Sequence, residues 1–412
     1  MKRLPNRREY PRTISADVNG FRGYLVIDST VNGVSAGGVR LKPGLTAGEL
    51  GRLARVMTLK FGFLGLPCGG AKAGLDIAGP LGPDERAAVF AAFGHALAPL
   101  IRTWEFRPGQ DLGTMPEDIS QMCRGAGVRP FESGALGSAY TGLSVAIAAD
   151  QAVRSQDRRS DRMSFAVAGF GRVGSAVACE MVLQGSRLVG ISTAQGALYN
   201  PQGLDLALLR KLQRQHGDDL VSAYKTADRI TPGMLLEADS DVLCPCGGPF
   251  AIDDANAARI RAGIICPGAN LPMTDAAEKI LAARGIVCVP DFIANCGGVL
   301  GPTMLSTGLP ADMVREFMHR RLTRRIAEIM AAAAQNRIPL GEWARVEAQR
   351  EFDRIRVEAR RYRRWMGLAR LGNYFFQRQW IPRRLAAAFA RGYFEKKILL
   401  STRPNGEAVE AR

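Results

Sequence analysis

A single lysine, Lys72, lies in a glycine-rich and otherwise apolar stretch at residues 66–75. The glycines at 69, 70 and 74 carry no side chains, so backbone and a small molecule can approach closely while neighbours pack against the lysine stem. Burial lowers the pKa of a lysine, and a second cation lowers it further; Lys60 is our candidate for that cation. The stretch predicts a lysine that acts as a base near neutral pH, unless it is only a turn whose lysine points into water.

Asp111 is the second residue whose type and position suggest chemistry. It lies in a loop between the Pro-Gly pair at 108–109 and Gly113, and a helix is predicted to begin after Thr114. An aspartate just before a helix is most often a cap or turn former. The alternative is a carboxylate that the loop delivers to the site of Lys72, and both interpretations stay open here.

A buried strand, a tight turn and a helix are predicted at residues 165–178, with glycines in the GxGxxG arrangement. The first glycine turns the chain, the second lets a pyrophosphate approach, and the third lets helix and strand pack. Because the motif follows a strand and opens a helix, it predicts a dinucleotide site. Its residues are Gly169, Phe170, Gly171, Arg172, Val173 and Gly174.

The next predicted strand, 187–192, ends in Ser192 and Thr193, where dinucleotide-binding domains usually carry Asp or Glu. Without that carboxylate, a contact that favours NAD is missing, and so is a repulsion against the 2′-phosphate of NADP. The cofactor is therefore predicted to be NAD or NADP.

Short apolar strands alternate with helices through the second part of the chain, which indicates a doubly wound α/β domain with a parallel sheet. Asn270 and Asn295 follow two of these strands, at the sheet edge where such domains bind ligands. Either could equally be a turn asparagine. Other predicted elements are a strand at 21–30, a turn at Asn32, and helices at 46–60, 83–102, 143–154 and 311–335.

The composition is that of a globular protein, with 412 residues, 47% hydrophobic and 23% charged. Single cores rarely exceed roughly 250 to 300 residues, so two domains are expected. The sequence shows neither a signal peptide nor an apolar run near 18 residues, and we expect a cytoplasmic location. The three histidines and eight cysteines have no zinc-type spacing, so no metal is predicted.

The formal net charge of +16 is concentrated in the C-terminal tail, because residues 351–412 contain 15 Lys or Arg and 6 Asp or Glu. The main body therefore gives no reason to expect a nucleic acid or a membrane as partner. Basic and aromatic residues are interleaved at 360–365 and 375–384. That pattern leaves a minor possibility of contact with an anionic membrane or nucleic acid, beside packing on a partner subunit or exposure to solvent.

The chain resembles the glutamate/leucine/phenylalanine/valine dehydrogenase family, and the match runs from about residue 20 to about residue 302. Nine motifs follow one another in the family's order: Ala36-Gly-Gly-Val-Arg40, Met57-Thr-Leu-Lys60, Pro67-Cys-Gly-Gly-Ala-Lys-Ala-Gly74, Asp111-Leu-Gly-Thr114, Tyr140-Thr-Gly142, Gly169-Phe-Gly-Arg-Val-Gly174, Tyr199-Asn-Pro-Gln-Gly-Leu-Asp205, Pro267-Gly-Ala-Asn270 and Pro290-Asp-Phe-Ile-Ala-Asn-Cys-Gly-Gly298.

The resemblance implies an N-terminal α/β substrate domain of the dimerisation type and a Rossmann-like NAD(P) domain. We expect these at residues 1–142 and 143–305, then helices that return to the first domain at 306–350, and a basic extension at 351–412. It also implies reversible oxidative deamination of an L-amino acid to the 2-oxo acid and ammonia, by a homo-oligomer that uses NAD or NADP.

By this resemblance, Lys72 is the catalytic lysine, Asp111 transfers protons and Lys60 binds the substrate α-carboxylate. A neutral amine that activates water and a carboxylate that moves the amine protons suit this chemistry independently. The resemblance also places further residues around the substrate, namely Ala36, Gly37, Gly38, Asn295 and Pro302. The residues that it places around the cofactor, beyond the glycine motif, Ser192 and Thr193, are Thr141, Asn270 and Asn295.

The identity of the substrate depends on two departures from the glutamate branch. Glutamate-specific relatives carry a lysine just before the first Gly-Gly pair and a serine shortly after the second, and both hold the distal carboxylate. Ala36 and Pro302 stand at those places here. Because burying a second carboxylate without a cation or hydroxyl is costly, we expect an apolar substrate of the leucine, valine or phenylalanine type, with glutamate as the alternative.

A non-catalytic homologue that senses amino acids or nucleotides is the rival from another class. Lys60, Lys72 and Asp111 together argue against it, because binding alone does not need all three. A nucleic-acid-binding protein is a third idea, and it rests only on the basic tail.

Overall fold

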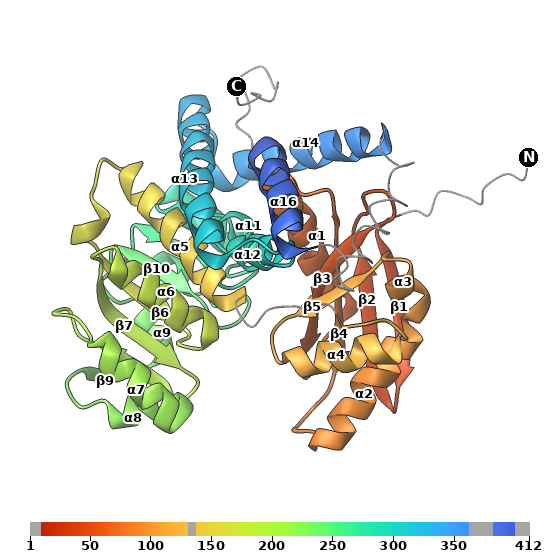
Figure 1. Ribbon diagram of the computed structural model, residues 1–412. Coiled ribbons are helices and arrows are strands. Elements are labelled where there is room, and N and C mark those ends of the chain that lie inside the picture. Colours follow the sequence, from red (N-terminus) through yellow and green to blue (C-terminus); the bar gives the residue numbers. More distant parts are fainter. Residues whose placement is uncertain (1–9, 131–136, 362–381, 400–412) are drawn as a thin grey trace, which may run out of the picture. The chain divides into compact units, whose positions relative to one another are not determined.

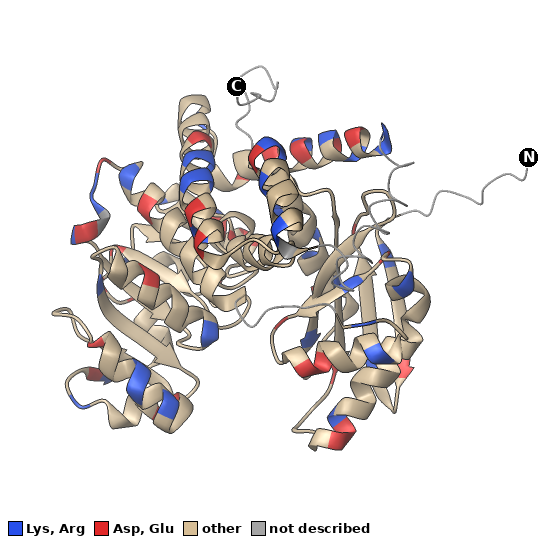
Figure 2. Cartoon of the chain, viewed as in Figure 1, with Lys and Arg blue, Asp and Glu red and all other residues tan. Residues whose placement is uncertain are grey.

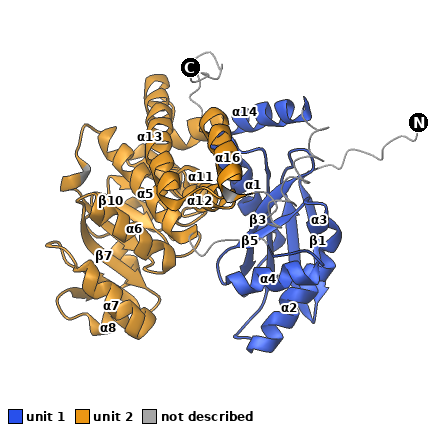
Figure 3. Ribbon diagram, in the orientation of Figure 1, with its two compact units in different colours: residues 1–134, 348–380 blue, residues 135–347, 381–412 orange. Residues whose placement is uncertain are grey.

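The computed structural model describes residues 10–130, 137–361 and 382–399 (Figure 1). The chain divides into two compact units (Figure 3). The first comprises residues 1–134 and 348–380, and the second comprises 135–347 and 381–412. The first division falls before a helix, α5 (Gly137–Arg154), whereas our proposed domain boundary at residue 142 lies within that helix. The second falls within another helix, α14 (Leu340–Arg361).

The first unit contains a five-stranded mixed sheet in the order β1-β2-β4-β3-β5. The first three strands in this order pair antiparallel, and β3 pairs in parallel with both of its neighbours. α1 covers one face, and α2, α3 and α4 pack on the other (Figure 1). The bounds are β1 (Arg12–Val18), β2 (Phe21–Ile27), β3 (Ser35–Leu41), α1 (Ala47–Leu64), β4 (Gly69–Asp76), α2 (Pro83–Ala96), α3 (Ala98–Arg102), β5 (Arg107–Gln110) and α4 (Pro116–Gly125).

The stretch around Lys72 is β4, a buried strand, so its interpretation as a turn with a solvated lysine is wrong. Alternate residues, among them Ala71 and Ala73, pack into the core with the phenylalanines of α2. The intervening glycines are closely packed on the opposite face: a Cβ at Gly70 would lie 2.3 Å from the Ala54 carbonyl oxygen of α1, and one at Gly74 would lie 2.4 Å from a methyl group of Leu45, which precedes α1. Glycine at 70 therefore lets strand and helix approach, and glycine at 74 leaves room for Leu45.

One predicted helix of this unit is divided in two, and another begins as expected. The helix expected at 83–102 is interrupted at Leu97 and forms α2 and α3, because Pro99 has no N–H to continue the helical hydrogen bonds. At the start of α1, the Thr46 hydroxyl accepts the Glu49 N–H, which is one half of a capping box. The Glu49 carboxylate accepts hydrogen bonds from Arg40 and Lys42.

The second unit contains a seven-stranded sheet in the order β12-β11-β10-β6-β7-β8-β9. Its first five strands are parallel, as expected of a doubly wound domain, but β8 and β9 add an antiparallel edge that the sequence analysis did not predict. The strands are β6 (Ser164–Ala168), β7 (Arg187–Thr193), β8 (Gly196–Tyr199), β9 (Asp228–Ile230), β10 (Val242–Pro245), β11 (Ile264–Ile265) and β12 (Val287–Cys288).

Short helices connect these strands, and longer ones form the rest of the unit. α5 packs closely on α12. The Cβ position of Gly297 is only 2.0 Å from the Tyr140 carbonyl oxygen, so only glycine leaves room for this approach. The bounds are α6 (Arg172–Leu183), α7 (Leu206–His216), α8 (Leu220–Ala223), α9 (Pro232–Leu236), α10 (Asp275–Ala283), α11 (Asp291–Ala294), α12 (Gly297–Leu305), α13 (Ala311–Asn336) and α16 (Arg383–Lys397), with 3₁₀ turns at Ser160–Arg162, Gly217–Asp219 and Ala257–Arg259.

α16 belongs to the basic tail and packs against α13. The Phe317 and Phe394 rings meet edge to face with centroids 6.2 Å apart, and Arg321 donates to the Glu395 carboxylate at 2.7 Å. Figure 2 shows acidic residues interspersed with basic ones along the ribbons of α13 and α14. The basic-aromatic stretches at 360–365 and 375–384 lie largely outside the described residues.

All eight cysteines are free thiols. Burial raises the pKa of the Cys68 and Cys246 thiols to about 12 in each case. Burial also raises the pKa of Cys288 to about 12. Among the described residues, no three His, Cys, Asp or Glu side chains gather as a metal site would require. No helix in this part of the chain combines the length and apolar character needed to cross a membrane.

Gly70→Ala should destabilise the protein, because its Cβ would lie 2.3 Å from backbone atoms of α1 that cannot rotate away. We expect a loss of about 1–3 kcal/mol in the free energy of unfolding. Gly48→Ala, within α1, is the matched control: its Cβ meets nothing closer than 3.9 Å, and alanine favours the helix by up to ~1 kcal/mol. Urea unfolding of both variants measures the difference, and equal midpoints would contradict the close approach of β4 and α1.

Candidate functional site

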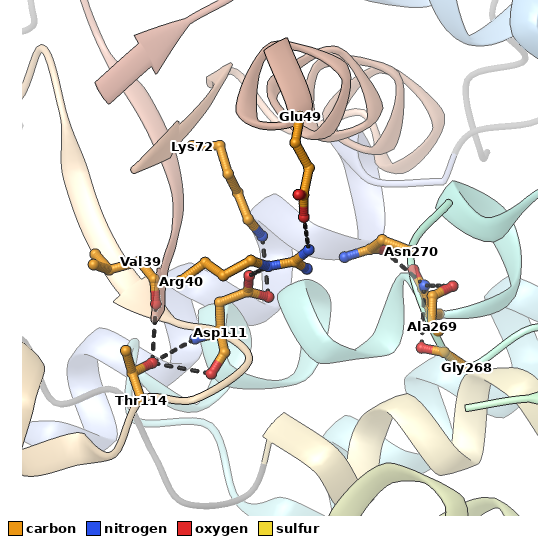
Figure 4. Close-up of polar contacts among 10 residues, drawn as sticks. Val39, Arg40, Glu49, Lys72, Asp111, Thr114, Gly268, Ala269 and Asn270 are labelled. Atoms are coloured by element: carbon orange, nitrogen blue, oxygen red, sulfur yellow. Dashed lines mark hydrogen bonds and ion pairs between the residues drawn. The ribbon is translucent and has the colours of Figure 1, made fainter. Parts of the chain in front are cut away.

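Lys72 and Asp111 come together in the first unit (Figure 4). The Lys72 Nζ, on β4, lies 3.1 Å from an oxygen of Asp111, in the loop after β5. Their side chains are 3% and 14% exposed, so the amine is nearly inaccessible and the carboxylate keeps a small opening to solvent. Of the two interpretations of Asp111, the structure therefore shows the carboxylate delivered to the lysine.

Hydrogen bonds through Thr114 hold the loop that carries Asp111 against β3. The Thr114 hydroxyl accepts the Asp111 N–H at 2.9 Å and lies 3.0 Å from the Val39 carbonyl oxygen, to which it can donate. Gly113 takes a positive φ of 78° at the turn. The N-terminus of α4 is capped by another residue, Asp118, whose carboxylate accepts the Met115 N–H at 2.7 Å. Asp111 is thus left to point at Lys72.

A buried arginine, Arg40, completes this arrangement. Its Nε donates to the second oxygen of Asp111 at 2.7 Å, and its Nη1 donates to Glu49 at 2.8 Å. Lys42 donates to the other Glu49 oxygen at 2.8 Å. Residues of β3, β4, α1 and the loop after β5 therefore form one continuous chain of charged contacts (Figure 4).

Burial and charge shift the pKa values of the pair in a way that suits acid–base chemistry. Burial lowers the pKa of Lys72; the Asp111 charge opposes this, and the Arg40 charge adds to it. Burial alone would raise the pKa of Asp111, but Lys72 and Arg40 outweigh it, and that pKa lies below its usual value. Asp111 therefore stays ionised while Lys72 gives up its proton more readily than a solvated lysine.

The other predicted residues of this unit lie on β3 and α1. Gly38 faces the pair, since a Cβ there would lie 3.2 Å from the Lys72 Nζ and 2.7 Å from the Asp111 Cβ. Gly37 has no room for a side chain either, with the Ala71 carbonyl oxygen 1.6 Å from its Cβ position. Ala36 is partly exposed, and Lys60 is buried on α1 at 4% exposure.

In the second unit, the three motif glycines have the properties that a dinucleotide turn requires. Gly169 has a φ of 107°, a conformation that other residues rarely adopt. A Cβ at Gly171 would meet nothing within 4 Å, so the N-terminus of α6 is open to a ligand. A Cβ at Gly174 would lie 2.0 Å from the Gly169 carbonyl oxygen, so the helix packs directly on the turn. The turn fits the pyrophosphate of a dinucleotide.

The residues around this turn are held by the end of β7. The Ser192 hydroxyl accepts the Gly169 N–H at 3.0 Å, and the Ser192 carbonyl accepts the Phe170 N–H at 2.6 Å. Thr193 donates to the Asp218 carbonyl at 2.8 Å. Of the remaining motif residues, Arg172 is exposed and Val173 is partly exposed.

Asn295 and Asn270 lie together beyond the carboxyl ends of the parallel strands. The Asn295 amide donates to the Asn270 side-chain oxygen at 2.9 Å and to the Ala269 carbonyl at 3.1 Å (Figure 4). Thr141 is on α5, and the Cβ position of Gly298 is 2.5 Å from its hydroxyl oxygen. Pro302 is partly exposed within α12. Because Asn295 donates to Asn270, the two side chains are hydrogen-bonded to each other and are not independent turn residues.

Sequence reasoning missed Arg40 and Glu49 as members of the site. A signal was present: Arg40 follows Gly38 at strand spacing, so both lie on one face of β3, and an arginine in the apolar run of β3 requires a partner. Glu49 also lies three residues after Thr46 at the start of a predicted helix, where an acidic residue is expected as part of a cap. That explanation concealed its contact with Arg40.

These two units define the class of protein: an α/β oxidoreductase with a dinucleotide turn in one unit and a lysine–aspartate pair in the other. Family models match both units, as "Glu/Leu/Phe/Val dehydrogenase, dimerisation domain" over residues 9–126 and "Glutamate/Leucine/Phenylalanine/Valine dehydrogenase" over residues 135–353. The chain belongs to the Glu/Leu/Phe/Val dehydrogenase family, and it is an NAD(P)-dependent amino acid dehydrogenase.

Individual relatives agree with this assignment. The chain is 34% identical to glutamate dehydrogenase of Thermotoga maritima over 308 residues, which cover 71% of this chain and 74% of the relative. It is 33% identical to the catabolic NAD-specific glutamate dehydrogenase RocG of Bacillus subtilis, covering 69% and 70%. A hetero-hexameric glutamate dehydrogenase of Thermus thermophilus, solved in a leucine-bound form, superposes with a TM-score of 0.73 and 26% identity, covering 85% of this chain and 89% of that one.

Gly171→Ala should weaken NAD(P) binding about ten-fold or more, because its methyl group would occupy the opening that a pyrophosphate needs. The Cβ meets no protein atom within 4 Å, so the unliganded protein should unfold at nearly the same temperature as the wild type. Gly174→Ala is the contrasting variant and should lose stability outright, since its Cβ collides with the Gly169 carbonyl. Calorimetric titration with NAD and NADP, beside thermal unfolding, checks both; unchanged affinity in Gly171→Ala would remove the turn from the binding site.

Proposed function

We propose that the chain catalyses the reversible oxidative deamination of an L-amino acid to the 2-oxo acid and ammonia, with Lys72 and Asp111 as catalytic residues. The single observation that supports this most is the buried pair itself, an amine with a lowered pKa 3.1 Å from an ionised carboxylate. A binding protein without turnover would gain nothing from burying two ionisable groups in contact, because their desolvation costs stability.

The roles of the pair follow from its protonation. Oxidation of the substrate at Cα leaves an imine, which water must attack. The neutral Lys72 amine accepts a proton from that water, and the Asp111 carboxylate moves protons to and from the departing nitrogen. Lys60 is proposed to bind the substrate α-carboxylate, and Gly37 and Gly38 to leave room for the substrate backbone.

The cofactor side is proposed to consist of the turn at 169–174 with Ser192, Thr193, Thr141, Asn270 and Asn295. Bound NAD or NADP supplies the hydride acceptor. The open N-terminus of α6 binds the pyrophosphate with backbone N–H groups, and the Asn295–Asn270 contact fixes both amides at the edge of the sheet.

For the substrate side chain, we propose an apolar amino acid of the leucine, valine or phenylalanine type, because Ala36 and Pro302 offer neither a cation nor a hydroxyl. Glutamate is the second candidate, and a specific observation favours it: the relatives at about a third identity are named glutamate dehydrogenases. We also propose that the protein works as a homo-oligomer; the hetero-hexameric assembly named for the Thermus thermophilus structure supports an oligomer, although its subunits differ.

Lys72→Ala should reduce kcat by about 10²–10⁴-fold while leaving NAD(P) affinity unchanged, because the amine is lost and the dinucleotide turn is untouched. Formation of reduced nicotinamide, followed by absorbance, measures turnover, and calorimetric titration measures cofactor binding. Lys279→Ala, at an exposed position of α10, is the control and should retain full activity. Near-normal turnover in the Lys72 variant would exclude this lysine from the mechanism.

Leucine, valine and phenylalanine should each be oxidised with a higher kcat/KM than glutamate, since one buried carboxylate without a partner costs several-fold to hundred-fold in binding. Parallel assays at equal NAD and NADP concentrations give the ranking and the cofactor preference together. A clear preference for glutamate would reject the apolar proposal and leave the deamination chemistry intact.

A further inference from the structure

Four charged side chains are linked in sequence to the Lys72 amine, and three of them have no role in the reaction proposed above. Asp111 contacts it from the loop after β5, Arg40 reaches Asp111 from β3, Glu49 reaches Arg40 from α1, and Lys42 reaches Glu49 from the end of β3. The Arg40 side chain is only 5% exposed, and Glu49 is 11% exposed. Placing these charges out of water is costly, so their arrangement needs an explanation.

We propose that Arg40, held in place by Glu49, is a positioning residue that orients the Asp111 carboxylate and supplies the countercharge that would otherwise come from a protonated Lys72. This inference rests on the proposed deamination chemistry. Its geometric basis is that one Asp111 oxygen accepts from Arg40 at 2.7 Å while the other lies 3.1 Å from Lys72. Each oxygen thus has its own partner, and the carboxylate cannot rotate without losing one.

The balance of formal charges also favours a neutral Lys72 when Arg40 is present. Within this set of contacts, a neutral Lys72 leaves two anions, Asp111 and Glu49, and two cations, Arg40 and Lys42, so the formal charges of the set cancel. The buried Lys60 is outside this set, and its charge is proposed to be matched by the substrate carboxylate. A protonated Lys72 would add one uncompensated positive charge inside the protein, which is unfavourable in a poorly solvated site. Without Arg40, the same site would contain an excess of negative charge and would favour the protonated amine.

The charges of Arg40 and Glu49 act on the pKa of Lys72 in opposite directions. Beyond burial and the opposing Asp111 charge, Arg40 lowers the pKa of Lys72, and Glu49 raises it. The activity of a lysine base is lost as pH falls through its pKa, so the acid limb of the kcat/KM profile reports this pKa. A positioning role therefore predicts shifts of opposite sign for the two residues, whereas a purely structural role predicts none.

The experiment compares the pH dependence of kcat/KM in the full-length wild type, Arg40→Gln, Arg40→Lys and Glu49→Gln. Arg40→Gln should move the acid limb to higher pH by about one unit and reduce kcat. Arg40→Lys keeps the positive charge but loses the guanidinium hydrogen bonds to Asp111 and Glu49. The acid limb should therefore stay near its wild-type pH, while kcat falls about ten-fold. Glu49→Gln should move the limb towards lower pH. NAD(P) affinity should be the same in all four proteins.

A second measurement separates this inference from the proposed function and does not need turnover. The ¹³C shift of the Lys72 Cε, assigned by its loss in Lys72→Ala, reports protonation of the amine directly across the pH range. Its midpoint should rise in Arg40→Gln and fall in Glu49→Gln, even if the substrate is unknown. If Arg40→Gln does not fold, the fall of the midpoint in Glu49→Gln still tests the inference, and Arg40→Lys should leave the midpoint near its wild-type value.

Unmoved midpoints in Arg40→Gln and Glu49→Gln, or in whichever of the two folds, would overturn the inference and reduce Arg40 to a structural ion pair. Absence of any dehydrogenase activity in the wild type, with the predicted shifts of the amine midpoint present, would instead overturn the proposed function and leave the electrostatic role of Arg40 standing.

Discussion

The burial of one amine against one carboxylate is the constraint on which the first unit depends. Lys72 can lie inside the protein only because Gly70 on its own strand lets α1 approach, and because glycines on β3 leave space beside it. Its partner comes from a loop that hydrogen bonds to β3 hold in place. The strands, the helix and the loop are thus required together, since removal of any one would expose the amine or separate it from Asp111.

The second unit meets a different requirement with the same residue type. There glycine turns the chain at 169, leaves an opening at 171 and permits contact at 174. In both units the absence of side chains leaves space for another group, which is a lysine stem in one and, as we propose, a dinucleotide in the other. This is why short glycine motifs identified the functional segments better than any measure of overall composition.

Much of the architecture could be predicted from local patterns, because strands of the second unit are apolar runs and its helices have clear ends. Three features could not. The break at Leu97 depends on one proline within an otherwise helical pattern. The edge strands β8 and β9 are short and carry weak periodicity. The contacts of Arg40 with Asp111 and Glu49 join residues up to 71 positions apart, and only the folded sheet brings them together. The pairing of Lys72 with Asp111 was expected from chemistry, although Asp111 by itself resembled a helix cap.

The raised pKa values of the buried thiols have a consequence for how the protein withstands oxidants and electrophiles. Cysteine reacts as the thiolate, and a thiol with a pKa of about 12 is ionised in only about one molecule in 10⁵ at pH 7. Cys68, which precedes the lysine strand, and Cys246, whose sulfur lies 2.7 Å from the Cβ position of Gly268, are therefore almost fully protonated at that pH. These two segments thus carry sulfur with little thiolate character, and the thiolate is the form that oxidants and electrophiles attack.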